Sequence, residues 1–131
     1  MKLKQKKSLL GFFLQSKNVP SFKKPVPKKY YFIIASEKFL LKEEPLEEVL
    51  RERFQYCLRE SKYMNFWLIQ SPKFLETSIM EPLKSKIPKK FTAIVSTNEP
   101  FIRWLKLRYH HVGIGSFFAP SRMIENPFSS K

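Results

Sequence analysis

The chain has 131 residues, a formal net charge of +14 and an aromatic content of 15%. Its single cysteine excludes an intrachain disulfide, and no apolar run approaches the roughly 18 residues of a membrane-spanning helix. We therefore expect one soluble, or at most peripheral, domain together with a tail.

Residues 1–29 carry most of the positive charge. They contain nine lysines and no acid, so residues 30–131 keep a net charge of only +5. The segment also holds a short apolar run at 9–14 and several prolines. This composition is typical of a disordered extension, of an organelle transit segment, or of a basic arm that touches an anionic membrane. We expect this extension to be poorly ordered and dispensable for folding.

Strand and helix patterns alternate from Tyr30 onward. The apolar run 30–35 predicts a strand, and Glu44-Pro45 predicts the start of a helix that runs to about Glu60. The apolar face of this helix contains Leu46, Val49, Leu50, Phe54, Cys57 and Leu58. A second strand is predicted at 65–70, and a weaker helix within 76–87 that Pro82 interrupts or starts.

The second half continues the alternation with a strand at 91–97, a helix at 98–109 and a strand at 110–118. The helix is marked by Asn98 as N-cap and Pro100 in the first turn. The β-α-β-α-β-α-β order predicts a single α/β domain over 30–128, followed by a tail at 129–131. Because the strands are apolar almost throughout, we expect a central sheet of about four strands covered by helices on both faces.

The sequence contains no catalytic constellation. Cys57 lies at the centre of an apolar helix face, as a packed core thiol would. His110 and His111 are adjacent, so in a strand they point to opposite faces and cannot ligate one metal ion. Gly113 and Gly115 lie within a predicted strand, not between a strand and a helix, so they form no phosphate-binding loop. We expect no catalytic, metal or cofactor site in this chain.

The helix predicted at 98–109 places an arginine within its apolar face. On a helical wheel Arg108 falls between Trp104 and Phe101, whereas Arg103 and Lys106 point the other way. Arg108 lies in the last turn, where a cation favours the helix dipole and its stem can extend past Trp104. Alternatively, Trp104 and Arg108 belong to a partner-binding patch, since Trp and Arg are enriched at binding hot spots. The residues alone leave both interpretations open.

Four segments of the chain together resemble one known family. They are YYFIIASEKFLLKEEPLEEVLRER (30–53), NFWLIQSPKFLE (65–76), AIVSTNEPFIRWLKLR (93–108) and the closing GSFFAPS…NPF. The family is the small accessory protein of the aerobic magnesium-protoporphyrin IX monomethyl ester cyclase, catalogued as hypothetical chloroplast reading frame fifty-four. The resemblance covers about residues 30–128.

The resemblance implies a non-catalytic accessory or assembly factor in chlorophyll biosynthesis. Such a protein binds and stabilises the diiron catalytic subunit of the cyclase, to which the iron and the substrate belong. The implied location is the chloroplast, in the stroma or on the stromal face of thylakoid membranes, with membrane contact only through the partner. Other enzymes of chlorophyll biosynthesis are possible further partners, and nucleic acid is not expected. The partner-binding residues that we expect are Asn65, Phe66, Trp104 and Arg108.

The sequence departs from the family pattern where acids are usual. Asn65 precedes the Phe-Trp pair, Ser116 and Phe118 replace acids near the closing strand, and Asn126 precedes Pro127. Any partner complementarity that depends on those acids is in doubt here. The alternative to the accessory role is a basic RNA-binding or membrane-surface protein, for which the lysine-rich extension and aromatic residues are the support.

Overall fold

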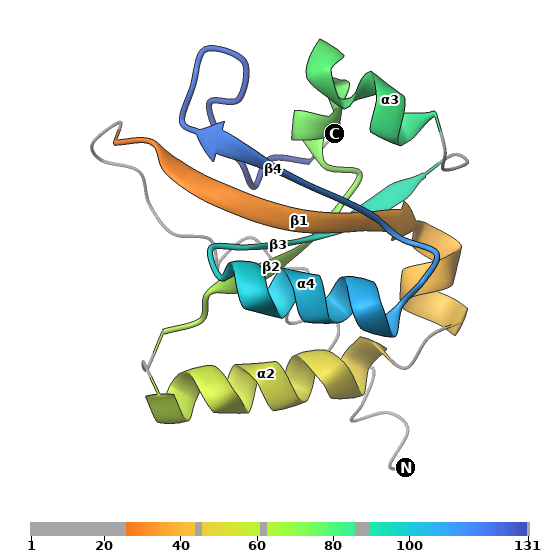
Figure 1. The fold of residues 1–131 in the computed structure, drawn as a ribbon, viewed down its shortest axis with the longest axis vertical. Coiled ribbons are helices and arrows are strands. Elements are labelled where there is room, and N and C mark those ends of the chain that lie inside the picture. The colour runs from red at the N-terminus through yellow and green to blue at the C-terminus, as the bar shows by residue number, and fades with distance from the viewer. Residues whose placement is uncertain (1–25, 44–45, 61–62, 86–89, 131) are drawn as a thin grey trace.

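The computed structural model describes residues 26–43, 46–60, 63–85 and 90–130. Its central sheet consists of β1 (Lys28–Ser36), β2 (Phe66–Gln70), β3 (Phe91–Ser96) and β4 (Gly113–Ala119). The strand order is β2-β3-β1-β4, and each neighbouring pair is antiparallel. The predicted single α/β domain with four strands is confirmed (Figure 1).

Two helices, α2 (Leu46–Glu60) and α4 (Glu99–Arg108), lie on the same side of the sheet (Figure 1). Their apolar side chains share one core cluster with the alternate strand residues that face them, including Ile33, Leu68 and Ile94. Helix α4 starts as predicted, because Asn98 Oδ1 accepts a hydrogen bond from the Phe101 N–H at 2.9 Å. The predicted start of the first helix at 44–45 lies outside the described residues.

Short helical segments cover the opposite face of the sheet. They are η3 (Lys73–Glu76), η4 (Ser78–Met80) and α3 (Glu81–Lys84), and α3 is the weak helix predicted within 76–87 with Pro82 at its start. Pro82 lies in the first turn of α3 and prevents the preceding turns from joining it. The C-terminal segment completes the cover, because Ile124 and Phe128 are buried in the same core cluster as Trp67.

The folded unit extends past the expected limits of 30–128 at both ends. Strand β1 starts at Lys28, which pairs with Ala119. Near the C-terminus, the Lys73 N–H donates to the Ser129 carbonyl oxygen at 2.9 Å, and Ser130 forms a bridge with Pro72. Most of the expected N-terminal extension, residues 1–25, lies outside the described residues.

Two segments differ from the predicted elements. A π-helical segment, η2 (Phe39–Glu43), follows β1 where no element was predicted. The last strand begins at Gly113 and not at His110, because His110 and His111 form a turn between α4 and β4. This turn is tied to the helix by Lys106, whose Nζ donates to the Val112 carbonyl oxygen at 2.6 Å.

Among the described residues, no helix has both the length and the apolar character needed to cross a bilayer.

We predict that Phe66→Ala will lower the free energy of unfolding by about 3–5 kcal/mol, because it opens a cavity beneath α4. Phe66 has no exposed surface, and its ring centroid is 5.8 Å from that of Phe101. Chemical denaturation followed by circular dichroism measures the change. The control is Trp104→Ala, whose side chain is 47% exposed and whose effect should be about 0.5 kcal/mol. Equal effects of the two substitutions would contradict the packing described here.

Burial raises the pKa of Tyr30 above its ordinary value of 10.0. The unfolded chain then loses the Tyr30 proton at a lower pH than the folded protein does. The contribution of this group to stability is therefore complete below about pH 10 and decreases as the pH rises further. We predict that Tyr30→Phe will lose less stability than the unsubstituted protein over that range. Parallel denaturant titrations at pH 9 and above test this, and identical pH slopes would contradict it.

Candidate protein-interaction site

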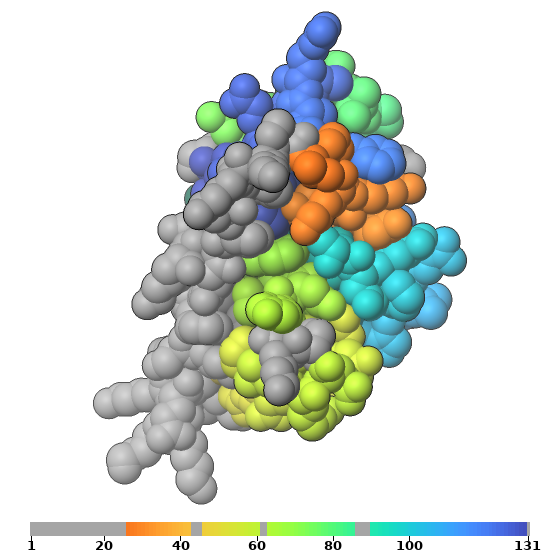
Figure 2. Space-filling view, turned by 90° about the vertical axis from the view of Figure 1, so that its left-hand side faces the viewer, coloured from red at the N-terminus to blue at the C-terminus, as the bar shows by residue number. Residues whose placement is uncertain are grey.

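An open groove of about 510 Å³ separates α2 from the N-terminal half of α4. Its walls include Arg53 and Tyr56 from α2 and Phe101 and Trp104 from α4. Figure 2 views the end of the molecule where these two helices meet, with α2 in yellow-green and the start of α4 in cyan. We call this feature the α2/α4 groove.

Two of the aromatic rings that line the α2/α4 groove are unusually accessible to solvent. Tyr56 is 44% exposed and Trp104 is 47% exposed. Phe101, in contrast, is buried and packs against Phe66, so the floor of the groove continues into the core. Exposed aromatic side chains beside a hollow are typical of surfaces that bind proteins.

Arg53 lies between two rings in the wall of the groove. Its guanidinium carbon is 4.8 Å from the ring centroid of Tyr56 and 4.5 Å from that of Phe101. One terminal nitrogen, Nη2, donates to Asn65 Oδ1 at 3.4 Å, and the Cys57 thiol donates to the same oxygen at 3.4 Å. Within the part of the chain that the structure describes, the buried Nε–H of Arg53 meets no hydrogen-bond acceptor.

A short series of polar contacts fixes the groove to the sheet. The Asn65 carbonyl oxygen accepts a hydrogen bond from the hydroxyl of Ser96 at 2.7 Å. The same hydroxyl oxygen accepts from the Asn98 N–H at 2.9 Å, and Asn98 caps α4. Ser96 is completely buried, so water does not compete for these bonds. The starts of β2 and α4 are thereby held together.

Arg108 lies on the solvent side of α4, beside Trp104 but outside the groove. Its guanidinium carbon is 5.9 Å from the Trp104 ring and 5.7 Å from the Tyr109 ring. Among the described residues no carboxylate is within 4.0 Å of Arg108. The exposed side of α4 therefore presents Trp104, Leu107 and Arg108 together, with Leu107 being 74% exposed.

The structure divides the four predicted partner-binding residues into three groups. Trp104 and Arg108 are exposed neighbours, and Asn65 lies behind the groove, where it contacts Arg53. Phe66 is completely buried, so the expectation that its side chain would be partly exposed is wrong. The reason is that β2 is a sheet strand whose side chains from Phe66 to Ile69 are all buried.

Arg53 and Tyr56 were not among the site residues expected from the sequence. Both lie on α2 three residues apart, a spacing that places two side chains on neighbouring positions of one helix face. Their proximity to Phe101 depends on how α2 and α4 pack, and no local pattern encodes that packing. The sequence indicates this site only by placing an arginine and a tyrosine on one face of the predicted helix.

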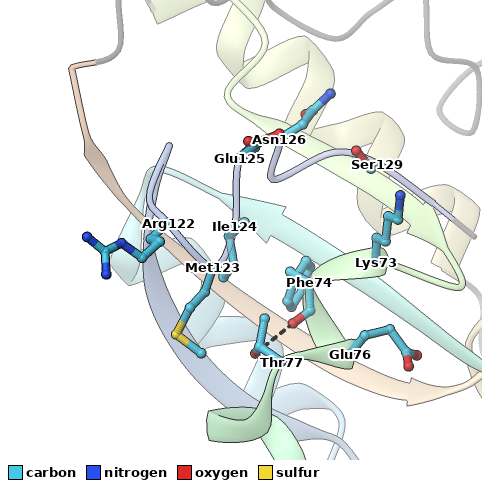
Figure 3. A pocket seen from close by; sticks show the side chains of 10 residues that line it. All are labelled: Lys73, Phe74, Glu76, Thr77, Arg122, Met123, Ile124, Glu125, Asn126 and Ser129. Atoms are coloured by element: carbon cyan, nitrogen blue, oxygen red, sulfur yellow. Dashed lines mark hydrogen bonds between the residues drawn. The ribbon is translucent and has the colours of Figure 1, made fainter.

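The other residues that depart from the family pattern lie elsewhere. Ser116 and Phe118 are exposed on β4, which forms an edge of the sheet. Asn126 lines a second hollow, of about 370 Å³, between η3 and the C-terminal segment (Figure 3). In that view Arg122 points away from the hollow, and Thr77 bonds to the Phe74 carbonyl oxygen. These positions and Asn65 do not form one continuous surface.

The described residues contain no group of three or more His, Cys, Asp or Glu side chains arranged to hold a metal ion. Cys57 is buried, as the helical pattern predicted. Two carboxylates each form an ion pair with an arginine on the surface of the same helix, Glu47 with Arg51 at 3.4 Å and Glu99 with Arg103 at 2.8 Å.

Comparisons with known proteins identify relatives in algae, cyanobacteria and plants. An uncharacterized ycf54 protein of Porphyra purpurea is 53% identical over 88 residues, which are 67% of this chain and 82% of that protein. A Ycf54-like protein of Synechocystis is 48% identical over 77% of this chain and 76% of its own length. The Arabidopsis thaliana protein named "Protein YCF54, chloroplastic" is 37% identical over 71% of this chain, which is 44% of that protein.

Solved structures agree with the fold. The All0216 protein of Nostoc superposes with a TM-score of 0.75 at 47% identity, covering 80% of this chain and 97% of that one. The Ycf54 protein of Synechocystis gives a TM-score of 0.75 at 45% identity, covering 80% and 98%. The sequence profile described as "Ycf54 protein" matches residues 28–119. The chain belongs to the Ycf54 family.

Proposed function

We propose that this chain is a non-catalytic accessory factor of the oxygen-dependent magnesium-protoporphyrin IX monomethyl ester cyclase in chlorophyll biosynthesis. It acts by binding the diiron catalytic subunit and stabilising it, while the iron and the substrate remain with that subunit. Membership of the Ycf54 family supports the assignment through the role that the resemblance implies. The chloroplast name of the Arabidopsis relative supports a plastid location, in the stroma or on the stromal face of thylakoid membranes.

The observation that carries the proposal is the exposed aromatic and cationic surface on α4 and the adjoining groove. Trp104 and Arg108 stand next to each other on the exposed side of the helix, without support from a carboxylate among the described residues. An exposed tryptophan and arginine contribute little to the stability of the free monomer. They can contribute much to the free energy of binding a partner, because these two residue types combine a large contact area with directed hydrogen bonds.

Affinity purification of the tagged full-length chain from its host tests the proposed function directly. We expect the diiron catalytic subunit to co-purify, and other enzymes of the pathway that co-purify with it are candidates for further partners. Cells that lack the chain should accumulate the magnesium-protoporphyrin monomethyl ester, because its ring-forming step depends on a stable catalytic subunit. Co-purification of RNA without that subunit would support the basic RNA-binding alternative, and binding of the isolated chain to anionic vesicles would support the membrane-surface alternative.

We predict that Arg108→Ala will weaken binding of the catalytic subunit by about 2 kcal/mol, as truncation of an interface arginine does. Stability should change by no more than about 0.5 kcal/mol, because the side chain is exposed. Isothermal calorimetry and a thermal melt on the same preparation measure both quantities. Arg103→Ala is the matched control, an exposed arginine of the same helix that pairs with Glu99. A large fall in melting temperature with unchanged affinity would refute the interface role of Arg108.

A further inference from the structure

Arg53 lies near the core of this domain, and the described residues compensate its charge only in part. It is only partly exposed, and no carboxylate among the described residues lies within 4.0 Å of it. Among the described residues, Arg53 Nη2 donates to the neutral side-chain amide oxygen of Asn65 at 3.4 Å, and the buried Nε–H of Arg53 meets no acceptor. A partly buried charge in this condition is costly unless another group compensates it.

The surroundings of Arg53 fix its guanidinium and leave room beside it. The Tyr56 and Phe101 rings hold the group at 4.8 and 4.5 Å, which limits its rotation before any ligand arrives. The open α2/α4 groove adjoins it, and the half-exposed Trp104 forms the opposite wall. The result is a preorganised cation at the side of an aromatic hollow.

We propose that the α2/α4 groove binds a glutamate or aspartate side chain of a protein partner, with an apolar neighbour of that residue resting against Trp104. The carboxylate accepts hydrogen bonds from the Arg53 guanidinium and compensates its charge. Arg108, one helical turn beyond Trp104, adds a second cation for an acidic segment. The proposal rests on the proposed function for the existence of the partner, and it names the chemistry by which that partner is recognised.

A single carboxylate fits the groove better than a phosphate or a nucleic-acid strand. Of the described residues that line the groove, Arg53 is the one cation and Glu52 the one anion. A dianionic phosphate would meet the Glu52 charge with only one guanidinium to offset it. A planar carboxylate carries half that charge and matches the guanidinium in shape. The aromatic walls suit the apolar part of a protein segment.

The decisive substitution is Asn65→Asp, because it places a carboxylate next to Arg53 without removing any packed side chain. Arg53→Ala is less informative, since it also empties the space between Tyr56 and Phe101. The new internal carboxylate should pair with Arg53, keep or raise the melting temperature, and repel the carboxylate of the partner. We expect the dissociation constant for the diiron catalytic subunit to rise about tenfold. A merely structural role of Arg53 predicts the same gain in stability with unchanged affinity.

Asn126→Asp is the matched control. It makes the same chemical change in the C-terminal hollow, where the Asn126 side-chain oxygen accepts from the Phe128 N–H at 2.9 Å. The control should bind the catalytic subunit as tightly as the unsubstituted chain. If Asn65→Asp binds as tightly as Asn126→Asp does, the groove does not receive a carboxylate from the partner. In that case a loss of binding in Trp104→Ala would still support the proposed function.

A probe that does not require the catalytic subunit separates the two proposals further. N-acetylphenylalanine carries a carboxylate and an aromatic ring, and N-acetylphenylalanine amide is its neutral counterpart. We expect the acid to shift the NMR resonances of the Trp104 indole N–H and the Arg53 Nε–H at millimolar concentration, and the amide and the Asn65→Asp protein to show no such shift. Equal shifts with the amide, or larger shifts with a uridine oligonucleotide, would overturn the carboxylate assignment whether or not the catalytic subunit binds.

Discussion

The buried hydroxyl of Ser96 joins the parts of this domain on which its surface depends. It donates to the carbonyl oxygen of Asn65 and accepts from the N–H of Asn98, so the starts of β2 and α4 are fixed to the end of β3. Asn98 then caps α4, and the Asn65 side chain reaches Arg53 on α2. These bonds act together with the shared apolar core of α2 and α4 to set the relative position of the two helices, and with it the shape of the groove.

The two faces of the sheet have different consequences for function. On one face, α2 and α4 bury their apolar sides and leave a groove between them whose walls contain Tyr56 and Trp104. On the other, short helical turns and the C-terminal segment close over a core of aromatic rings, such as the stacked pair Tyr30 and Phe117 with centroids 5.6 Å apart. The helical face therefore presents accessible aromatic and cationic groups beside a groove.

Elements with strong local signals were predictable from the sequence, and those that depend on long-range packing were not. Asn98 and Pro100 located the start of α4 to within a residue, and the apolar runs located all four strands. Strand order depends on contacts between distant segments, so no local pattern reveals it. The burial of Phe66 beside an exposed Trp104 likewise depends on how α4 sits on the sheet. Arg53 could not be predicted as a site residue, because its contacts with Asn65 and Phe101 form only when the chain is folded.

We propose that this protein binds the diiron catalytic subunit through the helical face around the α2/α4 groove. Hydrogen–deuterium exchange of the full-length chain, with and without that subunit, tests this proposal most directly. We expect slower exchange in the complex for residues 49–60 and 98–108, with little change in β4 and in the C-terminal segment. Protection confined to the β4 edge or to the hollow near Asn126, with α2 and α4 unaffected, would contradict it.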